Sequence, residues 1–309
     1  MPEFDLSVVV PVYNNAATLP ALMERLAAVV DATGLCAELI FVDDGSTDAS
    51  AALVAARAES DSRFVLLGLA ANFGGQAALC AGFDAVRGRR AVCLDADLEN
   101  LPEDIPALLA ALDQGHDLAC GVRQGRTRSW RSWASSLLNA YARSRLAHPV
   151  KDLGCGMRAM DSRVIDDLAS AGRKRCLLTP LLLERASSVV EVPVRWVRST
   201  DSGGHSFLSL LGMAFDYFML TAGRPFLVVG AVATVAAVGG TVAVLGGLHA
   251  GRSALALAGI FLASTGALGM AIALIGEYAQ RGYRRGDSEP LYRLRDADGD
   301  QRGRPAGSN

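Results

Sequence analysis

The chain has 309 residues, of which 51% are hydrophobic, and its formal net charge is −2 at pH 7. This length accommodates one α/β domain of roughly 200 residues plus an appendage. The mean hydropathy of +0.26 is high for a soluble protein, and the apolar excess lies after residue 225. The near-neutral charge gives no reason to expect a nucleic-acid partner.

Neither the N-terminus nor the cysteines indicate a secreted protein. The apolar run that begins at Leu6 follows no basic segment and is interrupted by Pro11, so it is a poor secretory signal. The six cysteines form no Cys-x-x-Cys pair, and several lie in apolar runs. This pattern suits reduced structural thiols better than a disulfide or zinc framework, and we expect a cytosolic first domain.

Short β-rich runs alternate with helical stretches through the first part of the chain. The β-rich runs are 6–12, 38–42, 64–69, 91–94 and 117–122, and the helical stretches include 17–30, 48–58, 76–86 and 103–112. Such alternation predicts an α/β fold with a mostly parallel sheet covered on both faces. Apolar residues are consecutive in 8–10 and 39–42, which is typical of strands buried on both sides.

Polar residues follow the first four predicted strands. They are Tyr13 and Asn14, then Asp43 and Asp44, then Asn72, and finally Asp95 and Asp97. Ligands of parallel α/β sheets bind at the carboxyl ends of the strands. We therefore expect these side chains to share one edge of the sheet.

Asp95 and Asp97 form an Asp-x-Asp pair directly after a predicted buried strand. Carboxylates are preferred ligands of Mg²⁺ and Mn²⁺, and such an ion offsets the charge that a departing nucleotide diphosphate accumulates. Alone the pair is a weak signal, because most such acids are solvated loop residues.

The segment 43–48 closes the second predicted strand and opens a helix. Gly45 allows a tight turn, and Ser46 or Thr47 is available as the helix cap. Asp43 or Asp44 could accept hydrogen bonds from a base or ribose, since an ionised carboxylate is an acceptor only. The alternative is that the segment serves only to start the helix.

A basic stretch lies between residues 118 and 150, which include no acidic side chain. Its arginines are Arg123, Arg126, Arg128, Arg131, Arg143 and Arg145. Guanidinium groups suit phosphate, and the neighbouring Trp130, Trp133 and Tyr141 are typical of lipid-headgroup contacts. We interpret the stretch as an anion site, with general attraction to anionic lipid as the alternative.

Two uncharged apolar runs, 226–248 and 254–275, contain 23 and 22 residues, near the roughly 20 needed to cross a bilayer. The five-residue connector permits only a hairpin, and the flanking arginines place both ends in the cytosol. The alternative is a pair of helices buried in a large core. We expect a catalytic domain at 1–205, an amphipathic interfacial helix at 206–223, two spans within 224–280 (about 226–248 and 254–276) and a cytosolic tail at 281–309.

Five motifs, taken in chain order, resemble those of family 2 glycosyltransferases. They are Val10-Pro11-Val12-Tyr13-Asn14, Asp43-Asp44-Gly45-Ser46-Thr47-Asp48, Asn72-Phe73-Gly74, Asp95-Ala96-Asp97-Leu98 and Asp152-Leu153-Gly154-Cys155-Gly156-Met157-Arg158-Ala159. The chain is most similar to the polyprenyl-phosphate branch, which includes dolichyl-phosphate mannose synthases and bacterial undecaprenyl-phosphate sugar transferases. The resemblance extends through both apolar runs to Gly276-Glu277-Tyr278.

The resemblance implies a GT-A fold, a UDP- or GDP-sugar donor with UDP favoured, a polyprenyl phosphate acceptor, inversion at the anomeric carbon, and Mg²⁺ or Mn²⁺. It implies a nucleotide-sugar site at Pro11, Tyr13, Asp43, Asp44, Asn72 and Asp95. The implied metal ligands are Asp97 and Asp95, with Glu99 as a third carboxylate where relatives often have Gln. The implied lipid-phosphate site is Arg123, Arg128, Arg131 and Ser135, and the implied catalytic residues are Asp95, Asp97, Asp152 and Arg158.

The chain departs from the family pattern at three places. Asn15 stands where relatives commonly have Glu, and the loop 201–207 lacks the lysine that relatives carry. His205 in that loop could partly replace the lysine or could be a surface residue. Trp196 follows a run superficially similar to the Gln-x-x-Arg-Trp signature of processive synthases, but the Gln is absent, so we interpret Trp196 as packing.

Two other functions remain open from the sequence. One is sugar transfer to a hydroxyl of a lipid or glycan, and the other is a non-catalytic membrane scaffold that kept the fold. The expected partners are a nucleotide sugar, a polyprenyl phosphate and the membrane, and the sequence is compatible with a homo-oligomer.

Overall fold

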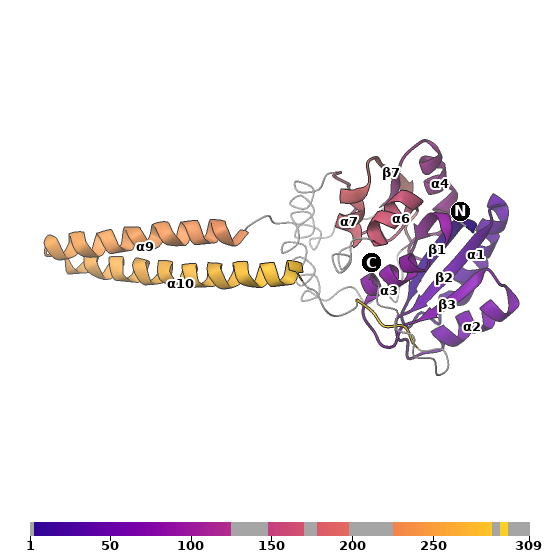
Figure 1. The fold of residues 1–309 in the computed structure, drawn as a ribbon, viewed down its shortest axis with the longest axis horizontal. Helices are drawn as coiled ribbons and strands as arrows, with labels where there is room; N and C mark the ends of the chain where they lie inside the picture. The colour runs from indigo at the N-terminus through magenta and orange to yellow at the C-terminus, as the bar shows by residue number, and fades with distance from the viewer. Residues whose placement is uncertain (1–2, 125–147, 170–177, 198–224, 286–290, 296–309) are drawn as a thin grey trace, which may run out of the picture. The chain divides into compact units, whose positions relative to one another are not determined.

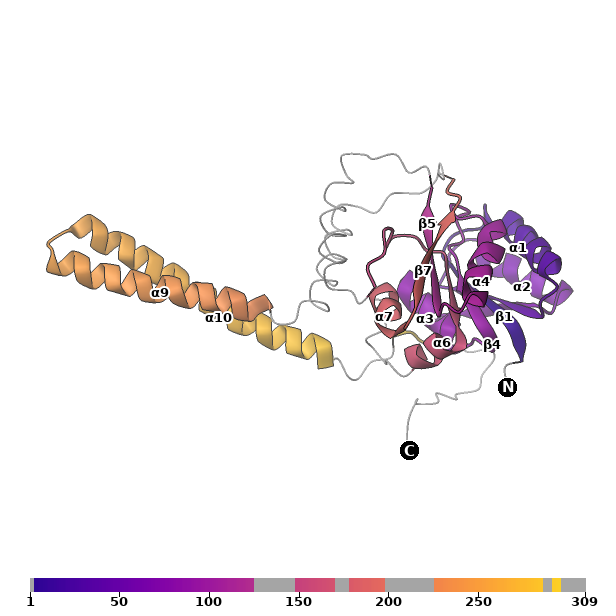
Figure 2. The ribbon, with the colours of Figure 1, turned by 90° about the horizontal axis from the view of Figure 1, so that it is seen from above.

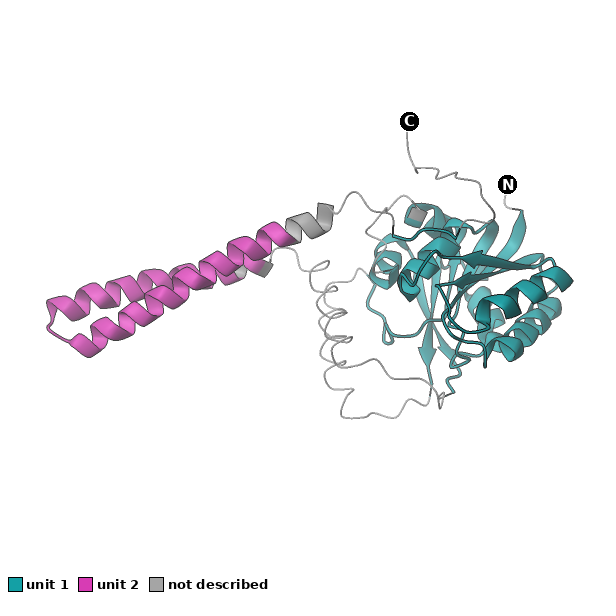
Figure 3. Ribbon diagram, turned by 90° about the horizontal axis from the view of Figure 1, so that it is seen from below, with its two compact units in different colours: residues 1–206, 289–309 teal, residues 207–288 magenta. Residues whose placement is uncertain are grey.

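We describe the protein from a computed structural model. The structure describes residues 3–124, 148–169, 178–197, 225–285 and 291–295. The chain divides into two compact units, one formed by Met1–Ser206 with Glu289–Asn309 and the other by Phe207–Ser288 (Figure 3). The first unit contains the predicted catalytic domain.

A sheet of seven described strands forms the centre of the first unit. The strands are β1 (Phe4–Val12), β2 (Ala37–Asp43), β3 (Phe64–Gly68), β4 (Gly88–Cys93), β5 (Leu118–Arg123), β6 (Arg158–Asp161) and β7 (Val189–Val194). Their order is β3-β2-β1-β4-β6-β5-β7, and Figure 2 shows β5 and β7 side by side. Of the described strands, β6 alone runs antiparallel to its neighbours. The sheet is therefore mostly parallel, as predicted.

Helices cover both faces of this sheet. They are α1 (Leu19–Thr33), α2 (Ser50–Ser60), α3 (Gly75–Asp84), the short 3₁₀ helix η1 (Pro102–Asp104), α4 (Ile105–Asp113), α6 (Ser162–Ala169) and α7 (Leu178–Arg185). Figure 1 shows α1 and α2 beside β1, β2 and β3. One apolar cluster joins α1, α2 and α4 to Val8 and Val10, and a second joins α3, α6 and α7 to Val9. Successive residues of β1 are thus buried on opposite faces, as the continuous apolar run predicts.

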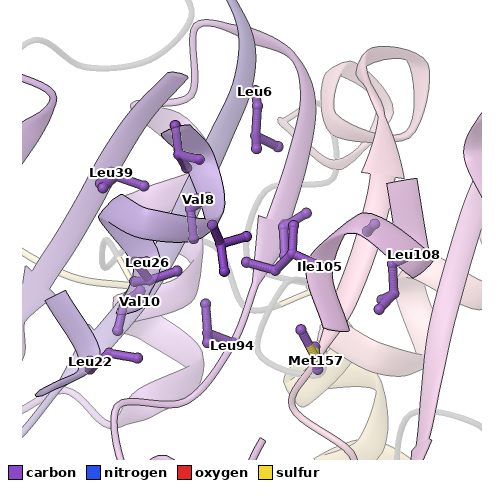
Figure 4. Packing of buried hydrophobic residues seen from close by; sticks show 14 of the residues in the cluster. Leu6, Val8, Val10, Leu22, Leu26, Leu39, Leu94, Ile105, Leu108 and Met157 are labelled. Atoms are coloured by element: carbon purple, nitrogen blue, oxygen red, sulfur yellow. The ribbon is translucent and has the colours of Figure 1, made fainter. Parts of the chain in front are cut away.

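Large aliphatic side chains fix the first cluster. Leu22 and Leu26 of α1 and Ile105 of α4 are fully buried against the sheet (Figure 4). Each such side chain stabilises the fold by roughly 1.5–3 kcal/mol relative to an exposed one. Leu94, which directly precedes the Asp-x-Asp pair, belongs to the same cluster. The Asp-x-Asp pair therefore directly follows a residue of the close-packed core.

The register of the parallel strands aligns their carboxyl ends. Val12 lies opposite Asp43, and Asp43 lies opposite Gly68. On the other side of β1, Val9 lies opposite Cys93, whose partner on β6 is Arg158. The loops that follow β1, β2, β3 and β4 consequently emerge at one edge of the sheet.

The second unit contains a helical hairpin. Its helices are α9 (Pro225–His249) and α10 (Ser253–Arg285), and the stretches Val229–His249 and Ser253–Ala279 are long and apolar enough to cross a membrane. Glycines let the backbones approach closely, since a Cβ on Gly240 would lie 2.3 Å from the amide nitrogen of Ala263. Large side chains point outward: Val235 is 73% exposed and Phe261 is 74% exposed. The alternative of two helices buried in a large core is therefore wrong.

Candidate active site

A pocket of about 370 Å³ lies at the carboxyl edge of β1, β2 and β4. It contains six of the predicted site residues, which are Pro11, Tyr13, Asp44, Asn72, Asp95 and Asp97. The other lining residues are Val12, Asn15, Gly74, Gly75 and Ala96. The sheet thus gathers into one cavity side chains that are more than 80 residues apart in the chain.

The loop after β1 is held by the turn that follows β2. Asn14 has a φ of 54°, a left-handed conformation that asparagine tolerates better than most residues. Its amide donates to Ser46 Oγ at 3.0 Å, and its Oδ1 accepts from the amide of Thr47 at 2.8 Å. Asn15, which sequence reasoning did not place in the site, lines the pocket, and its Oδ1 accepts from the amide of Tyr13 at 2.9 Å.

The predicted helix cap at Ser46 or Thr47 is wrong. Helix α2 begins at Ser50 and its N-cap residue is Ala49, while Asp48 Oδ1 accepts from the amide of Ser50 at 2.9 Å. The hydroxyl of Ser46 accepts from Asn14 instead. The residues that resemble a cap therefore fasten the β1 loop to the β2 turn, which a helix-start pattern alone does not indicate.

Asp44 joins the turn after β2 to the loop after β3. Only 2% of Asp44 is exposed, and its two carboxylate oxygens accept from the amides of Phe73 at 2.7 Å and Gly74 at 2.8 Å. Burial raises the pKa of Asp44 above its ordinary value. Gly45, with a φ of +70°, takes the predicted tight turn, and a Cβ there would lie 2.8 Å from the carbonyl carbon of Ala71.

Asp43 faces away from the pocket. It is completely buried and is absent from the pocket lining. Its Oδ1 accepts from the amide of Ser46 at 3.1 Å, and its Oδ2 lies 3.5 Å from Arg295 Nη2. Either Asp43 or Asp44 was expected to contact the base or ribose, and of the two Asp44 lines the cavity while Asp43 is directed into the turn.

Asp95 and Asp97 form the acidic wall of the pocket. Burial, followed by the nearby charge of Asp97, raises the pKa of Asp95, and burial also raises the pKa of Asp97. Between them and Glu99 lies Leu98 with a φ of 59°, a conformation of the kind that clusters at functional sites. Acids with raised pKa values in a cavity are candidate functional groups.

Gly156 lets Asp95 take its position. A Cβ on Gly156 would lie 2.0 Å from Asp95 Oδ2, so no other residue fits without moving the carboxylate. The motif 152–159 therefore acts on the site by close backbone approach, beside the β6 strand that begins at Arg158.

The predicted set of three metal-ligating carboxylates does not form. Among the described residues no three His, Cys, Asp or Glu side chains group as metal ligands. Glu99 Oε2 accepts from Trp196 Nε1 at 3.0 Å, and the backbone oxygen of Glu99 accepts from the amide of Val197 at 2.9 Å. Glu99 is therefore tied to the segment after β7, where Trp196 donates a hydrogen bond to it.

Asp95 and Asp97 alone still fit a Mg²⁺ or Mn²⁺ ion. Mg²⁺ is usually held by one or two protein carboxylates plus substrate phosphates and water. Two partly buried acids with raised pKa values gain from a cation, because its charge offsets the cost of burying theirs.

The remaining described site residues, Arg123, Asp152 and Arg158, do not line the pocket. Arg123 Nε and Nη2 donate to the two oxygens of Asp152, each at 2.8 Å. Arg158 is 6% exposed, and its Nη2 donates to the backbone oxygen of Leu153 at 3.0 Å. The guanidinium of Arg123 is thus engaged by Asp152, and its place in a lipid-phosphate site stays a prediction. Predicted residues that lie outside the described part of the chain are Arg128, Arg131, Ser135 and His205.

Solved structures define the class of fold. Glucosyl-3-phosphoglycerate synthase from Mycobacterium tuberculosis in complex with UDP matches with a TM-score of 0.52 at 21% identity, over 71% of this chain and 79% of that chain. The complex of the same enzyme with Mn²⁺, UDP and glucosyl-3-phosphoglycerate matches with a TM-score of 0.51 at 22% identity, over 71% of this chain and 78% of that chain. Together with the sheet order, this likeness defines a GT-A-like α/β fold, as predicted.

Residues 7–168 match the model of glycosyl transferase family 2, and the chain belongs to that family. It is 33% identical to undecaprenyl-phosphate 4-deoxy-4-formamido-L-arabinose transferase from Salmonella paratyphi A, over 93% of this chain and 91% of the relative. The protein of the same name from Enterobacter sp. gives the same values. The predicted polyprenyl-phosphate branch is confirmed, and the protein is a glycosyltransferase.

Proposed function

We propose that the protein transfers a sugar from a nucleotide sugar, with UDP favoured over GDP, to undecaprenyl phosphate or a similar polyprenyl phosphate. The observation that carries this proposal is the single pocket in which Asp95 and Asp97 lie with Tyr13 and Asp44. The 33% identity to undecaprenyl-phosphate sugar transferases over nearly the whole chain supports the acceptor.

The β1 and β2 side of the pocket suits the nucleoside. Tyr13 is 47% exposed and offers an aromatic face to a base. Asp44 and Asn72 lie in the same wall and offer acceptor oxygens to an imide or to ribose hydroxyls. Because backbone amides already fix the Asp44 carboxylate, its position does not depend on the ligand.

The β4 side of the pocket suits the diphosphate. Asp97, with Asp95 beside it, would hold Mg²⁺ or Mn²⁺, and the bound ion supplies charge stabilisation to the leaving nucleotide. The amide of Glu99 donates to Asp97 Oδ1 at 2.9 Å, which orients this carboxylate. The glucosyl-3-phosphoglycerate synthase of the same fold was crystallised with Mn²⁺ and UDP.

The acceptor needs no general base in this reaction. A phosphate monoester carries about −1.5 to −2 charges near neutral pH and is already a nucleophile. Alignment of its oxygen with the anomeric carbon then suffices, and direct displacement inverts that carbon.

The helical hairpin anchors the enzyme at the membrane in this proposal. The stretches in α9 and α10 that are apolar enough to cross a bilayer would return the chain to the cytosol, where arginines flank both ends. Residues 1–205 would then form the cytosolic catalytic domain, 206–223 an interfacial helix and 281–309 a cytosolic tail. Arg128, Arg131 and Ser135 are proposed to bind the lipid phosphate, and His205 to take part in the loop that lacks the lysine.

The test is a transfer assay with the purified full-length protein in detergent. Labelled UDP- and GDP-sugars are offered with undecaprenyl or dolichyl phosphate, with Mg²⁺, Mn²⁺ or EDTA. We expect label in the organic phase that depends on the cation and is released by mild acid, as a glycosyl phosphate is. An acid-stable lipid product would indicate a hydroxyl acceptor, and absence of both nucleotide binding and transfer would indicate a scaffold.

A further inference from the structure

The segment Leu291–Arg295, which follows the membrane hairpin in the chain, pairs with the edge of the catalytic sheet. Leu294 forms an antiparallel bridge with Leu69, directly after β3. The amide of Ala70 donates to the oxygen of Arg293 at 2.8 Å, and the amide of Arg295 donates to the oxygen of Gly68 at 2.7 Å. The segment thus satisfies backbone groups that an edge strand would otherwise leave unpaired.

Side chains anchor the same segment to the core. Leu291 and Tyr292 pack against the second apolar cluster, and Tyr292 Oη donates to Asp84 Oδ2 at 2.6 Å. Gly68 and Arg295 lie against each other, since a Cβ added to Gly68 would be in ordinary contact with the Cβ of Arg295 at 3.5 Å. Backbone pairing and side-chain packing together fix the position of the Arg295 backbone.

Arg295 forms an ion pair with Asp43, a carboxylate that has one oxygen without a hydrogen-bond donor in the described structure. Asp43 Oδ2 is buried and accepts no hydrogen bond in the described structure. Its ion-pair partner is Arg295 Nη2 at 3.5 Å, and the two side chains are 1% and 53% exposed respectively. A buried carboxylate without a nearby cation is costly, so this guanidinium offsets the charge of Asp43.

The turn that contains Asp43 also contributes to the wall of the proposed nucleotide pocket. Asp43 Oδ1 closes the turn by accepting from Ser46, and the next residue, Asp44, lines the cavity and holds the loop at Phe73 and Gly74. An uncompensated charge on Asp43 would therefore disturb a turn and a loop that both touch the ligand.

We propose that Arg295 is a positioning residue for the nucleotide. This inference rests on the proposed function, in which the pocket binds a nucleotide sugar. Its guanidinium, delivered by the edge segment 291–295, holds Asp43 and with it the turn that presents Asp44. Arg295 acts through Asp43 and does not line the pocket, so it sets the affinity for the donor and not the rate of the chemical step.

The experiment compares Arg295→Ala, Arg295→Lys and Arg293→Ala in the full-length protein. Arg293 is a matched control, because its side chain is exposed two residues away and its substitution removes the same charge. Calorimetry measures the Kd of UDP and of GDP, and steady-state assays measure KM and kcat for both substrates. We expect R295A to raise the nucleotide Kd and donor KM by about fivefold to tenfold, a range between those of exposed and buried ion pairs.

The pattern of results separates positioning from simple stabilisation. A positioning role requires kcat and the lipid KM within about twofold of wild type, restoration of most of the affinity by R295K, and no change in R293A. Wild-type nucleotide affinity in R295A would overturn the inference and leave the proposed function intact. Failure of the wild-type protein to bind either nucleotide would instead overturn the proposed function. If R295A unfolds, R295Q is measured below its Tm, and wild-type affinity there also overturns the inference.

Discussion

Arg123 and Asp152 form a doubly hydrogen-bonded ion pair, with both nitrogen–oxygen distances at 2.8 Å. The two side chains are only 12% and 14% exposed. The pair joins the end of β5 to the loop that places Gly156 against Asp95. The sequence analysis assigned Arg123 to a lipid-phosphate site and Asp152 to the catalytic residues. In the structure the two form one ion pair, which supports the loop next to Asp95.

Replacement of Asp152 by Ala should be strongly destabilising. It leaves a largely buried guanidinium without its partner, which typically costs about 3–5 kcal/mol in the free energy of unfolding. The double variant Arg123→Met/Asp152→Leu, which removes both charges, should recover much of this loss. Chemical unfolding in detergent measures both. Equal stability of D152A and wild type would show that the pair does not brace the loop.

Gly156→Ala should reduce transfer activity through Asp95. The new methyl group would meet a carboxylate oxygen at 2.0 Å, so Asp95 must move, and the strain costs about 1–3 kcal/mol. We expect a higher cation concentration for half-maximal transfer, measured by Mn²⁺ titration. Gly239→Ala on α9 is the control, because nothing lies within 4 Å of its added Cβ, and it should titrate as wild type does.

The apolar strands were predictable because runs of apolar residues are a local signal. The predicted runs 6–12, 38–42 and 64–69 overlap β1, β2 and β3 with ends shifted by at most two residues. The acids after β2 and β4 follow from the rule that ligands bind at strand ends. By contrast, β6 has only four residues, Arg158–Asp161, and such a short strand next to a Gly-rich loop shows no periodicity.

Contacts between distant residues were not predictable from local patterns. The hydrogen bond from Trp196 to Glu99 spans 97 residues, and the pairing of Arg295 with Asp43 spans the whole catalytic domain. Each depends on the order of strands in the sheet, which the sequence does not display. For this reason Glu99 resembled a metal ligand, and the attachment of the cytosolic tail to the sheet was not predicted.

Asp44 should give the protein a specific dependence of stability on pH. Burial raises its pKa above the ordinary value of 3.8, so the folded state binds this proton more tightly than the unfolded state does. The stabilising contribution is fully present below pH 3.8 and is lost as the pH rises through the folded-state pKa. As the pH rises from 3.8 through the folded-state pKa, the Tm of wild type should therefore fall relative to the Tm of Asp44→Ala. A difference independent of pH would contradict the raised pKa.

Glu99 and Trp196 can be tested as a structural pair. Trp196→Phe removes the indole donor and should cost about 1 kcal/mol of unfolding free energy, measured by chemical denaturation. Glu99→Gln keeps an oxygen that can accept this bond, so its metal dependence should match wild type within about twofold. A large rise in the Mn²⁺ concentration required by E99Q would instead make Glu99 a metal ligand.

Asp97→Asn should abolish cation-dependent transfer while the protein remains folded. The carboxylate lines the pocket and is oriented by the amide of Glu99, so the amide variant keeps the shape and loses the charge. Loss of charge stabilisation worth several kcal/mol corresponds to a decrease in kcat of at least about 100-fold. Asp31→Asn makes the same chemical change at a side chain that is 64% exposed, and it should retain wild-type kcat. Since burial raises the pKa of Asp97, removing its charge should not lower the Tm of the metal-free protein. Transfer by D97N in the presence of EDTA, at a rate near that of wild type, would exclude a metal role for this residue.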